Sequence, residues 1–436
     1  METNQLRLSV TLLAGFQWLF FMFANTVVIP ISVGGALNLE QVEIVSAIQR
    51  SFILTGIACI LQGFIGHRLA LMEGQSGLWW GVILSLAGTA SAMNLNFATV
   101  GGSIAVGAMI AGALVALFGI MGIGEILKRW FTPAVMFVFL LLLANQLISI
   151  FLKGMIGLNT GETIDVRMAI FSFCLAAFTI LVHVKGKGIL SSLNLLVGMV
   201  VGWIVAVLIF PNEAQETIHT TPFLKWFPWG EPALEWGIVL TVVVTGLLNT
   251  TNTVATLKGA EDIYEKETTR FQYRSSFFLT GILTTISGML GLVPYAPYAS
   301  SLGFLQSTGI KERAPFFLGA ALFIFLGMIP PLTAFFSTIP QSVGNTVLFV
   351  AYLQLFRSSL RSVEGLSFEP KTIYRVALPA LLGLSIMTLP SSVFSTLPEL
   401  VQPLLSNGLL MGIIAALVME LLYWFGPRIR RLPLRK

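Results

Sequence analysis

Apolar residues recur along the chain in runs of about 20, and short polar or Gly- and Pro-containing stretches separate these runs. A helix needs about 20 apolar residues to cross the hydrocarbon core of a bilayer, which is about 30 Å thick. The pattern therefore predicts fourteen membrane-spanning segments. Their approximate bounds are 8–33, 42–65, 70–93, 101–123, 131–152, 166–184, 189–210, 236–256, 273–291, 293–309, 314–335, 340–361, 373–390 and 404–425.

The segment 293–309 is apolar, but it cannot form one continuous helix. Pro294 and Pro297 lack an amide donor, and each forces the residue before it out of the helical region. We predict an extended start, followed by a short helix that begins near Ser300 and Ser301, which are good N-cap residues. Extended backbone inside a membrane is tolerated only in contact with protein or a water-lined cavity, so a broken span indicates a transporter's binding site.

A second break lies within Leu69–Trp80, where Gly, Ser and Glu interrupt an apolar run. From Arg68 to Gly74, an extended chain covers roughly 20 Å, which passes the midplane of the bilayer core. Interrupted spans at corresponding positions of two halves are typical of an inverted repeat. We expect the two broken spans to enter from opposite sides and to meet with their half-helix N-termini facing each other.

Composition supports a membrane protein. Of the 436 residues, 56% are hydrophobic and only 10% are charged, and the mean hydropathy is +0.86. Soluble proteins carry about 25% charged residues. We therefore expect a polytopic membrane protein without a sizeable soluble domain. Cys59 and Cys174 both fall within predicted spans, which argues against a disulfide or a metal site.

Basic residues are distributed asymmetrically in this topology. The chain has 25 Lys and Arg residues. Only Lys153, Arg167 and Lys225 fall on the side opposite the N-terminus, Arg50 lies within a span, and all the others are on the N-terminal side. The positive-inside rule assigns that side to the cytoplasm. We expect a multi-pass protein of the plasma (inner) membrane with both termini cytoplasmic, and we interpret the basic clusters as topology signals rather than as a nucleic-acid surface.

The span 236–256 carries polar side chains at three- and four-residue spacing: Thr245, Asn249, Asn252, Thr253 and Thr256. This spacing places them on one helix face. They could form interhelical hydrogen bonds, as such residues commonly do in membranes, or they could face a substrate. The broken spans favour the substrate interpretation because they offer a cavity.

Other polar residues within spans leave alternatives open. Gln17 and Asn25 share a face with Trp18 adjacent, and they fit either a site or helix packing. Arg50 and Glu73 are ionisable groups at membrane depth, which indicates a proton or substrate group. Alternatively, these two pair with each other, or Arg50 extends to the interface. We find no nucleophile–base grouping, phosphate loop or metal-like spacing, so we do not expect an enzyme.

These features resemble the nucleobase–cation symporter-2 family, which includes the uracil and xanthine permeases, over nearly the whole chain. Residues 16–20 and 25–30 resemble the family's first helix with its Gln-His pair, although Trp18 occupies the His position. The family signature in the tenth span is an acidic residue or Gln, then Asn, any residue, Gly, four residues, Thr and a small or basic residue. This chain has Ser-Ser-Leu-Gly at 300–303 and Thr-Gly at 308–309. The whole chain looks closest to a subgroup of candidate purine permeases.

The resemblance implies roles for residues at matching positions. Asn249 is at the position of a Glu that contacts the base, and Thr253 is where some members have a proton-handling His. Gly77 occupies the break in the third span where an aromatic residue often follows the serines. The implied substrate-binding residues are Gln17, Trp18, Gln75, Ser76, Gly77, Asn249, Thr253, Tyr298, Ala299, Ser300 and Ser301.

The resemblance also implies an all-α fold of fourteen spans arranged as 7+7 inverted repeats, residues 1–232 and 233–436. Spans 1–4 and 8–11 would form a core domain, and spans 5–7 and 12–14 a gate domain. Substrate would bind between them and move in an elevator-like step, without a cofactor but with H⁺ or Na⁺ as candidate coupling ion. Members are often homodimers through the gate domain.

The departures from the family pattern change the expected chemistry. An Asn side chain both donates and accepts hydrogen bonds, so it can bind the edge of a purine. Without carboxylates at Asn249 and Ser300, a neutral heterocycle fits better than an anionic one, and Glu73 becomes the candidate proton carrier. The alternative is an anion carrier of the same architecture, like the sulfate and bicarbonate transporters, because facing helix N-termini favour anions.

Overall fold

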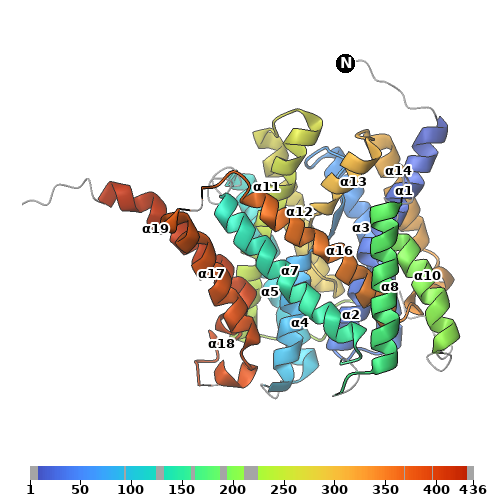
Figure 1. Ribbon diagram of the computed structural model, residues 1–436, viewed down its shortest axis with the longest axis horizontal. Coiled ribbons are helices and arrows are strands. Elements are labelled where there is room, and N and C mark those ends of the chain that lie inside the picture. Colours follow the sequence, from blue (N-terminus) through green and yellow to red (C-terminus); the bar gives the residue numbers. More distant parts are fainter. Residues whose placement is uncertain are drawn as a thin grey trace, which may run out of the picture.

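The computed structural model describes residues 8–92, 95–123, 132–158, 163–186, 194–210, 224–367, 369–394 and 396–429. Regular structure in these ranges is helical apart from one small two-stranded sheet (Figure 1). Some basic residues that support the predicted topology lie outside the described ranges; they are Arg7, Lys128, Arg129, Lys187 and those after residue 429.

The helices of the first half coincide closely with the apolar runs. In chain order they are α1 (Leu8–Thr26), α2 (Val28–Ala36), α3 (Gln41–Phe64), α4 (Gly77–Ala92), α5 (Phe97–Met121), α7 (Pro133–Met155), α8 (Val166–Lys185) and α10 (Asn194–Ile209), with strand β1 (Glu73–Gln75) before α4. The first run is divided between α1 and α2 because Pro30 has no N–H to donate to the carbonyl of Thr26.

The second half follows the runs with one exception. It comprises α11 (Trp236–Tyr264), α12 (Arg270–Leu290), β2 (Tyr295–Pro297), α13 (Ser300–Thr308), α14 (Arg313–Gly327), α15 (Pro330–Ser337), α16 (Gln341–Ser362), α17 (Pro370–Thr388), the 3-10 helix η2 (Ser391–Phe394), α18 (Gln402–Leu405) and α19 (Gly408–Ile429). The run predicted as one span at 314–335 is not one continuous helix, because α14 and α15 meet at an angle of 93°. Two prolines follow Ile329, whose backbone is extended (φ −105°, ψ 95°), so the helix ends there.

Six helices of the described chain are long and apolar enough to cross a membrane, or seven if the bent pair α14–α15 counts as one span. The helices α4, α10 and α19 are apolar but shorter. In the case of α4, the shortness reflects the strand that precedes it, since β1 and α4 together replace one continuous span.

Helix packing is most extensive within two sets. In one set, α5 packs against α12 and α11, and α14 packs against α1 and α3; in the other, α7 packs against α16 and α19, and α17 against α19 (Figure 1). Fewer contacts join the sets, among them those of α4 with α7 and of α2 with α16. Glycine allows the closest approach: a Cβ added to Gly281 of α12 would lie 2.3 Å from the backbone nitrogen of Ala116 in α5.

Candidate functional site

Two broken segments meet at the centre of the site. Strands β1 and β2 pair antiparallel, with Glu73 opposite Pro297 and Gln75 opposite Tyr295. The pairing extends beyond the strands, because the Ser76 amide donates to the Pro294 carbonyl at 2.8 Å. Each strand leads directly into a helix, α4 and α13. The predicted interruption of both segments is confirmed, and their backbone groups are satisfied by each other rather than by lipid.

The helix α13 begins at Ser300, as predicted, but its N-cap differs from the prediction. Ser300 and Ser301 were expected to cap the helix, but the N-cap is Ala299, which has helical backbone angles and makes no side-chain cap bond. The Ser301 hydroxyl instead accepts a hydrogen bond from the Met72 amide at 3.0 Å. Ser301 therefore holds the β1 segment against α13, because that amide needs a partner inside the protein.

The polar face of α11 contacts both broken segments. The Asn249 Nδ2 donates to the Tyr295 carbonyl at 3.0 Å, and its Oδ1 accepts from the Ser76 hydroxyl at 2.6 Å. The Asn252 Nδ2 lies 2.9 Å from the same Oδ1 and 3.2 Å from the Ser76 oxygen. Further along, the Thr256 hydroxyl donates to the Pro297 carbonyl at 3.2 Å. Asn249 is 3% exposed, so this face is directed into the protein.

One edge of this cluster is open. Gly77, Asn252 and Tyr298 are partly exposed, and Ala299 and Ser300 in the first turn of α13 are exposed. A Cβ on Gly77 would lie 3.2 Å from the hydroxyl of Tyr352, which belongs to α16 of the other packing set. The start of α4 thus lies where the two helix sets meet, at the open edge of the cluster.

Other residues implied by the resemblance lie beside this cluster. The Gln75 Nε2 donates to the Ser51 hydroxyl at 3.1 Å, so its side chain turns toward α3. The Tyr298 hydroxyl donates to the Gln75 carbonyl and lies 3.4 Å from the Asn25 carbonyl. Thr253 is 1% exposed, one turn after Asn249 on α11. The Gln75 Oε1 is buried without a hydrogen-bond partner in the described part of the chain, and the hydrogen bonds of Gln75 and Tyr298 hold the backbone around the site in shape.

The first helix contributes packing. Trp18 is 1% exposed, and its ring centroid lies 4.4 Å from that of Phe304 and 4.9 Å from that of Phe316. Gln17 is 8% exposed. Trp18 therefore joins α1 to α13 and α14 through aromatic contacts, and the structure does not bring it into the Asn249 cluster.

Arg50 and Glu73 do not form the ion pair that the sequence left open. The Arg50 Nη1 donates to the Ser46 hydroxyl at 2.7 Å on the same helix. The Glu73 Oε1 accepts from the Thr280 hydroxyl of α12 at 2.7 Å. No group of three or more His, Cys, Asp or Glu side chains in the described ranges could hold a metal ion.

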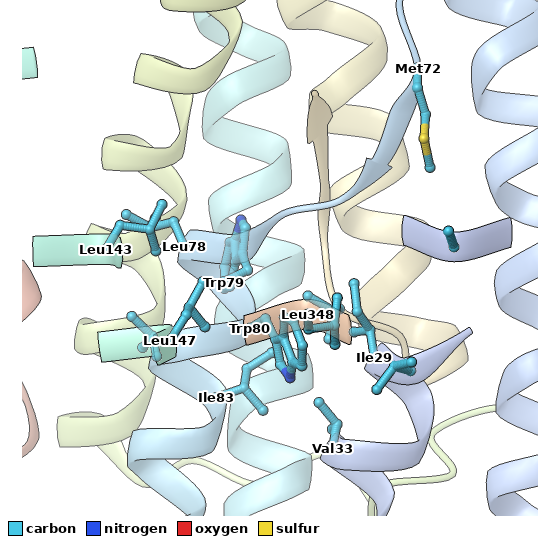
Figure 2. Close-up of a cluster of buried hydrophobic side chains, with 14 of the residues drawn as sticks. Ile29, Val33, Met72, Leu78, Trp79, Trp80, Ile83, Leu143, Leu147 and Leu348 are labelled. Carbon is cyan, nitrogen blue, oxygen red and sulfur yellow. The ribbon is translucent and has the colours of Figure 1, made fainter. Parts of the chain in front are cut away.

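Apolar packing holds α4 against the second helix set. Figure 2 shows Trp79 and Trp80 of α4 with Leu143 and Leu147 of α7 and Leu348 of α16. The indole nitrogen of Trp80 donates to the Ser32 hydroxyl at 2.7 Å, which fixes the ring in this apolar layer. A hydrogen bond crosses this layer, since the Gln146 Nε2 of α7 donates to the Gly81 carbonyl of α4 at 2.7 Å.

Sequence reasoning did not include three polar residues among the implied site residues: Asn252, Thr280 and Gln62. The signal for Asn252 was its spacing, since it shares a face with Asn249. For Thr280 and Gln62, the only signal was a polar side chain inside an apolar run, which many spans contain.

A model of a permease family, the xanthine/uracil permeases, matches residues 9–392. The chain belongs to this family. The resemblance to the nucleobase–cation symporters is thereby confirmed, and the protein is a membrane transport protein rather than an enzyme. Among its relatives, the candidate purine permease YwdJ of Bacillus subtilis is 28% identical over 424 residues, 94% of each chain. The xanthine permease of the same organism is 21% identical, covering 95% of this chain and 93% of the relative.

Solved structures show the fold of this xanthine/uracil permease family member. The transmembrane domain of the cyanobacterial bicarbonate transporter BicA matches with a TM-score of 0.63 at 15% identity, covering 95% of this chain and 98% of that one. The murine anion transporter Slc26a9 in its inward-facing state matches with a TM-score of 0.66 at 11% identity, covering 98% and 70%. At these identities the likeness establishes a helical membrane-transporter fold and nothing about substrate.

Proposed function

We propose that this chain is a secondary-active permease for nucleobases, with purines favoured, of the plasma membrane. The observation that carries the proposal is the cluster of Asn249, Asn252 and Ser76, which presents amide and hydroxyl groups next to the exposed first turn of α13. An amide can donate to and accept from one edge of a flat heterocycle at once. Relatives named as purine, xanthine and uric acid permeases support this substrate class.

The cluster favours a neutral ring. Its described side chains are uncharged, and Glu73 is turned toward α12. A base would replace the hydrogen bonds between Asn252 and Ser76, while Tyr298 and the helix N-termini of α4 and α13 would border its plane and edge. A buried site built from hydrogen-bonding groups rejects ligands that leave those groups unpaired.

We propose that transport follows an elevator-like alternating access. The helix set that contains α11, α4 and α13 would be the core domain, and the set of α7, α16 and α19 the gate domain. The layer of Trp80 against α7 and α16 supports such a division, because it consists mainly of apolar side chains, and sliding would break the Gln146–Gly81 hydrogen bond that crosses it. In this proposal residues 1–232 and 233–436 are inverted repeats, both termini are cytoplasmic, the coupling ion is H⁺ or Na⁺, and gate domains pair in a homodimer.

Uptake of radiolabelled bases tests the substrate. Cells or proteoliposomes containing the protein should accumulate at least one of adenine, guanine, hypoxanthine, xanthine and uracil, with sulfate and bicarbonate as controls. Asn249→Ala should lower uptake at least tenfold, since it removes the central amide. Thr245→Ala is the matched control, because Thr245 lies one turn away on the same face and bonds only within α11. Uptake of sulfate alone would refute the proposal.

An anion carrier is the second candidate. Two solved structures with this fold belong to anion transporters, and paired half-helix N-termini favour anions. The described cluster offers no cationic side chain, and an anion such as bicarbonate needs compensation of its charge. The sulfate and bicarbonate arms of the uptake assay decide between the two.

A further inference from the structure

The Glu73 carboxyl is fully buried behind the proposed substrate site. The residue is 0% exposed and belongs to β1, three positions before Ser76. Its Oε1 accepts from Thr280, whereas its Oε2 has no hydrogen-bond partner among the described residues. Buried carboxylate oxygens are normally bonded, and a protonated carboxyl group would carry its hydrogen on this free oxygen. The Glu43 Oε2 also has no partner in the ranges that the structure describes, so the free oxygen alone does not distinguish the two acids.

No cation balances Glu73 among the described residues. The other buried acid, Glu43, has the Lys225 ammonium as its ion-pair partner. Arg50 is buried, but it bonds Ser46 instead. An ionised carboxylate without a cation is costly inside a protein, and such a group takes up a proton instead. The ion pair with Lys225 therefore distinguishes Glu43 from Glu73, which has a hydrogen-bond donor but no cation within the described ranges.

The groups that face Glu73 come from three elements. From α12, the Thr280 hydroxyl donates to the carboxyl, and Gln62 of α3 donates in turn to the Thr280 oxygen at 3.0 Å. The titratable neighbours are the Cys59 thiol of α3 and the Tyr295 hydroxyl of β2. Both are uncharged near pH 7 at their ordinary values. A proton gained or lost at Glu73 is therefore the only charge change among these facing groups.

The position of Glu73 connects it to the substrate cluster. Its strand is paired with β2, whose Tyr295 carbonyl accepts from Asn249, and β1 continues directly into Ser76. Ionisation would strengthen the Thr280 bond, because charge-assisted bonds are shorter and stronger. A shift of β1 toward α12 would move Ser76 relative to Asn249, so the proton and the base would affect each other's binding.

We propose that Glu73 is the proton-coupling residue of this transporter, with Thr280 and Gln62 as positioning residues. The inference rests on the proposed nucleobase transport. Glu73 takes a proton from water on one side of the membrane while the base is bound, and it returns that proton to water on the other side. One proton thus crosses with each base, and no other reactant is needed.

Proteoliposomes with an imposed pH gradient test this assignment. Wild-type protein should concentrate the base when the interior is alkaline. Glu73→Gln should keep base-for-base exchange but lose gradient-driven accumulation at least tenfold, and its exchange rate should no longer depend on pH. Glu43→Gln is the matched control, since it removes the other buried carboxylate, and it should keep the pH dependence. Equal accumulation and an unchanged pH profile in Glu73→Gln would overturn the assignment.

Two further results separate the outcomes. If Glu73→Gln does not fold, Glu73→Asp should accumulate base with a shifted pH midpoint, and an unshifted midpoint would overturn the assignment. If wild-type protein moves no base in either assay, the proposed function fails. If wild type exchanges bases but accumulates them only with a Na⁺ gradient, nucleobase transport stands and the role of Glu73 is refuted.

Discussion

Asn249 should stabilise the junction between α11 and the broken segments, and its removal should be measurable. The side chain takes part in three hydrogen bonds, with the Tyr295 carbonyl, the Ser76 hydroxyl and the Asn252 amide. Side-chain hydrogen bonds inside membrane proteins contribute about 0.6 kcal/mol each on average. Asn249→Ala should therefore lower the free energy of unfolding by about 2 kcal/mol, and by about 3 kcal/mol if the Tyr295 carbonyl stays unpaired.

Equilibrium unfolding in mixed micelles measures this change. Thr245→Ala is the control, because the Thr245 hydroxyl donates to the Thr241 carbonyl of its own helix at 2.7 Å. That carbonyl keeps its helical partner, so we expect a loss below about 1 kcal/mol. Asn249→Asp keeps an acceptor for the Ser76 hydroxyl, but its carboxylate has no donor for the Tyr295 carbonyl. Its free energy of unfolding should therefore lie between those of wild type and Asn249→Ala. If Asn249→Ala unfolds like Thr245→Ala, the three bonds do not hold the junction.

Two other changes test the fold away from the substrate cluster. Burial lowers the pKa of His67, in the connection after α3, to about 3, whereas an unfolded histidine titrates near 6.5. Below pH 6.5 the unfolded state then binds more protons than the folded state, so the free energy of unfolding should decline as the pH falls, by about 2 kcal/mol at pH 5 relative to neutral pH. His67→Gln should flatten this pH profile. An identical slope in His67→Gln would contradict this expectation. Gly281→Ala would place a Cβ 2.3 Å from the Ala116 nitrogen and should destabilise the protein by about 1–3 kcal/mol in the same unfolding assay. Gly88→Ala, where a Cβ meets nothing within 4 Å, should be neutral or slightly stabilising, and equal stability of the two variants would refute the close packing of α5 and α12.

The sequence by itself determined most of the helices and the interruptions before α4 and α13, but not the bend between α14 and α15. The backbone N–H and C=O groups of an apolar run of about 20 residues can bond each other within the membrane when the run forms a helix. Pro294 and Pro297 remove donors that a continuous helix would need. The spacing of Asn249 and Asn252 was likewise enough to put them on one face. These features are local, because they depend on the covalent chain and on residues within one or two turns.

Only the tertiary structure decided which polar groups meet. Ser301 was expected to cap α13, but it binds Met72, which is far away in sequence. Glu73 could have paired with Arg50, yet it lies against Thr280 of α12. Such partners depend on how β1 and β2 pair and on which helices pack beside them. Hydrogen-bonding side chains inside a membrane have several partners of similar energy, so packing geometry selects among them.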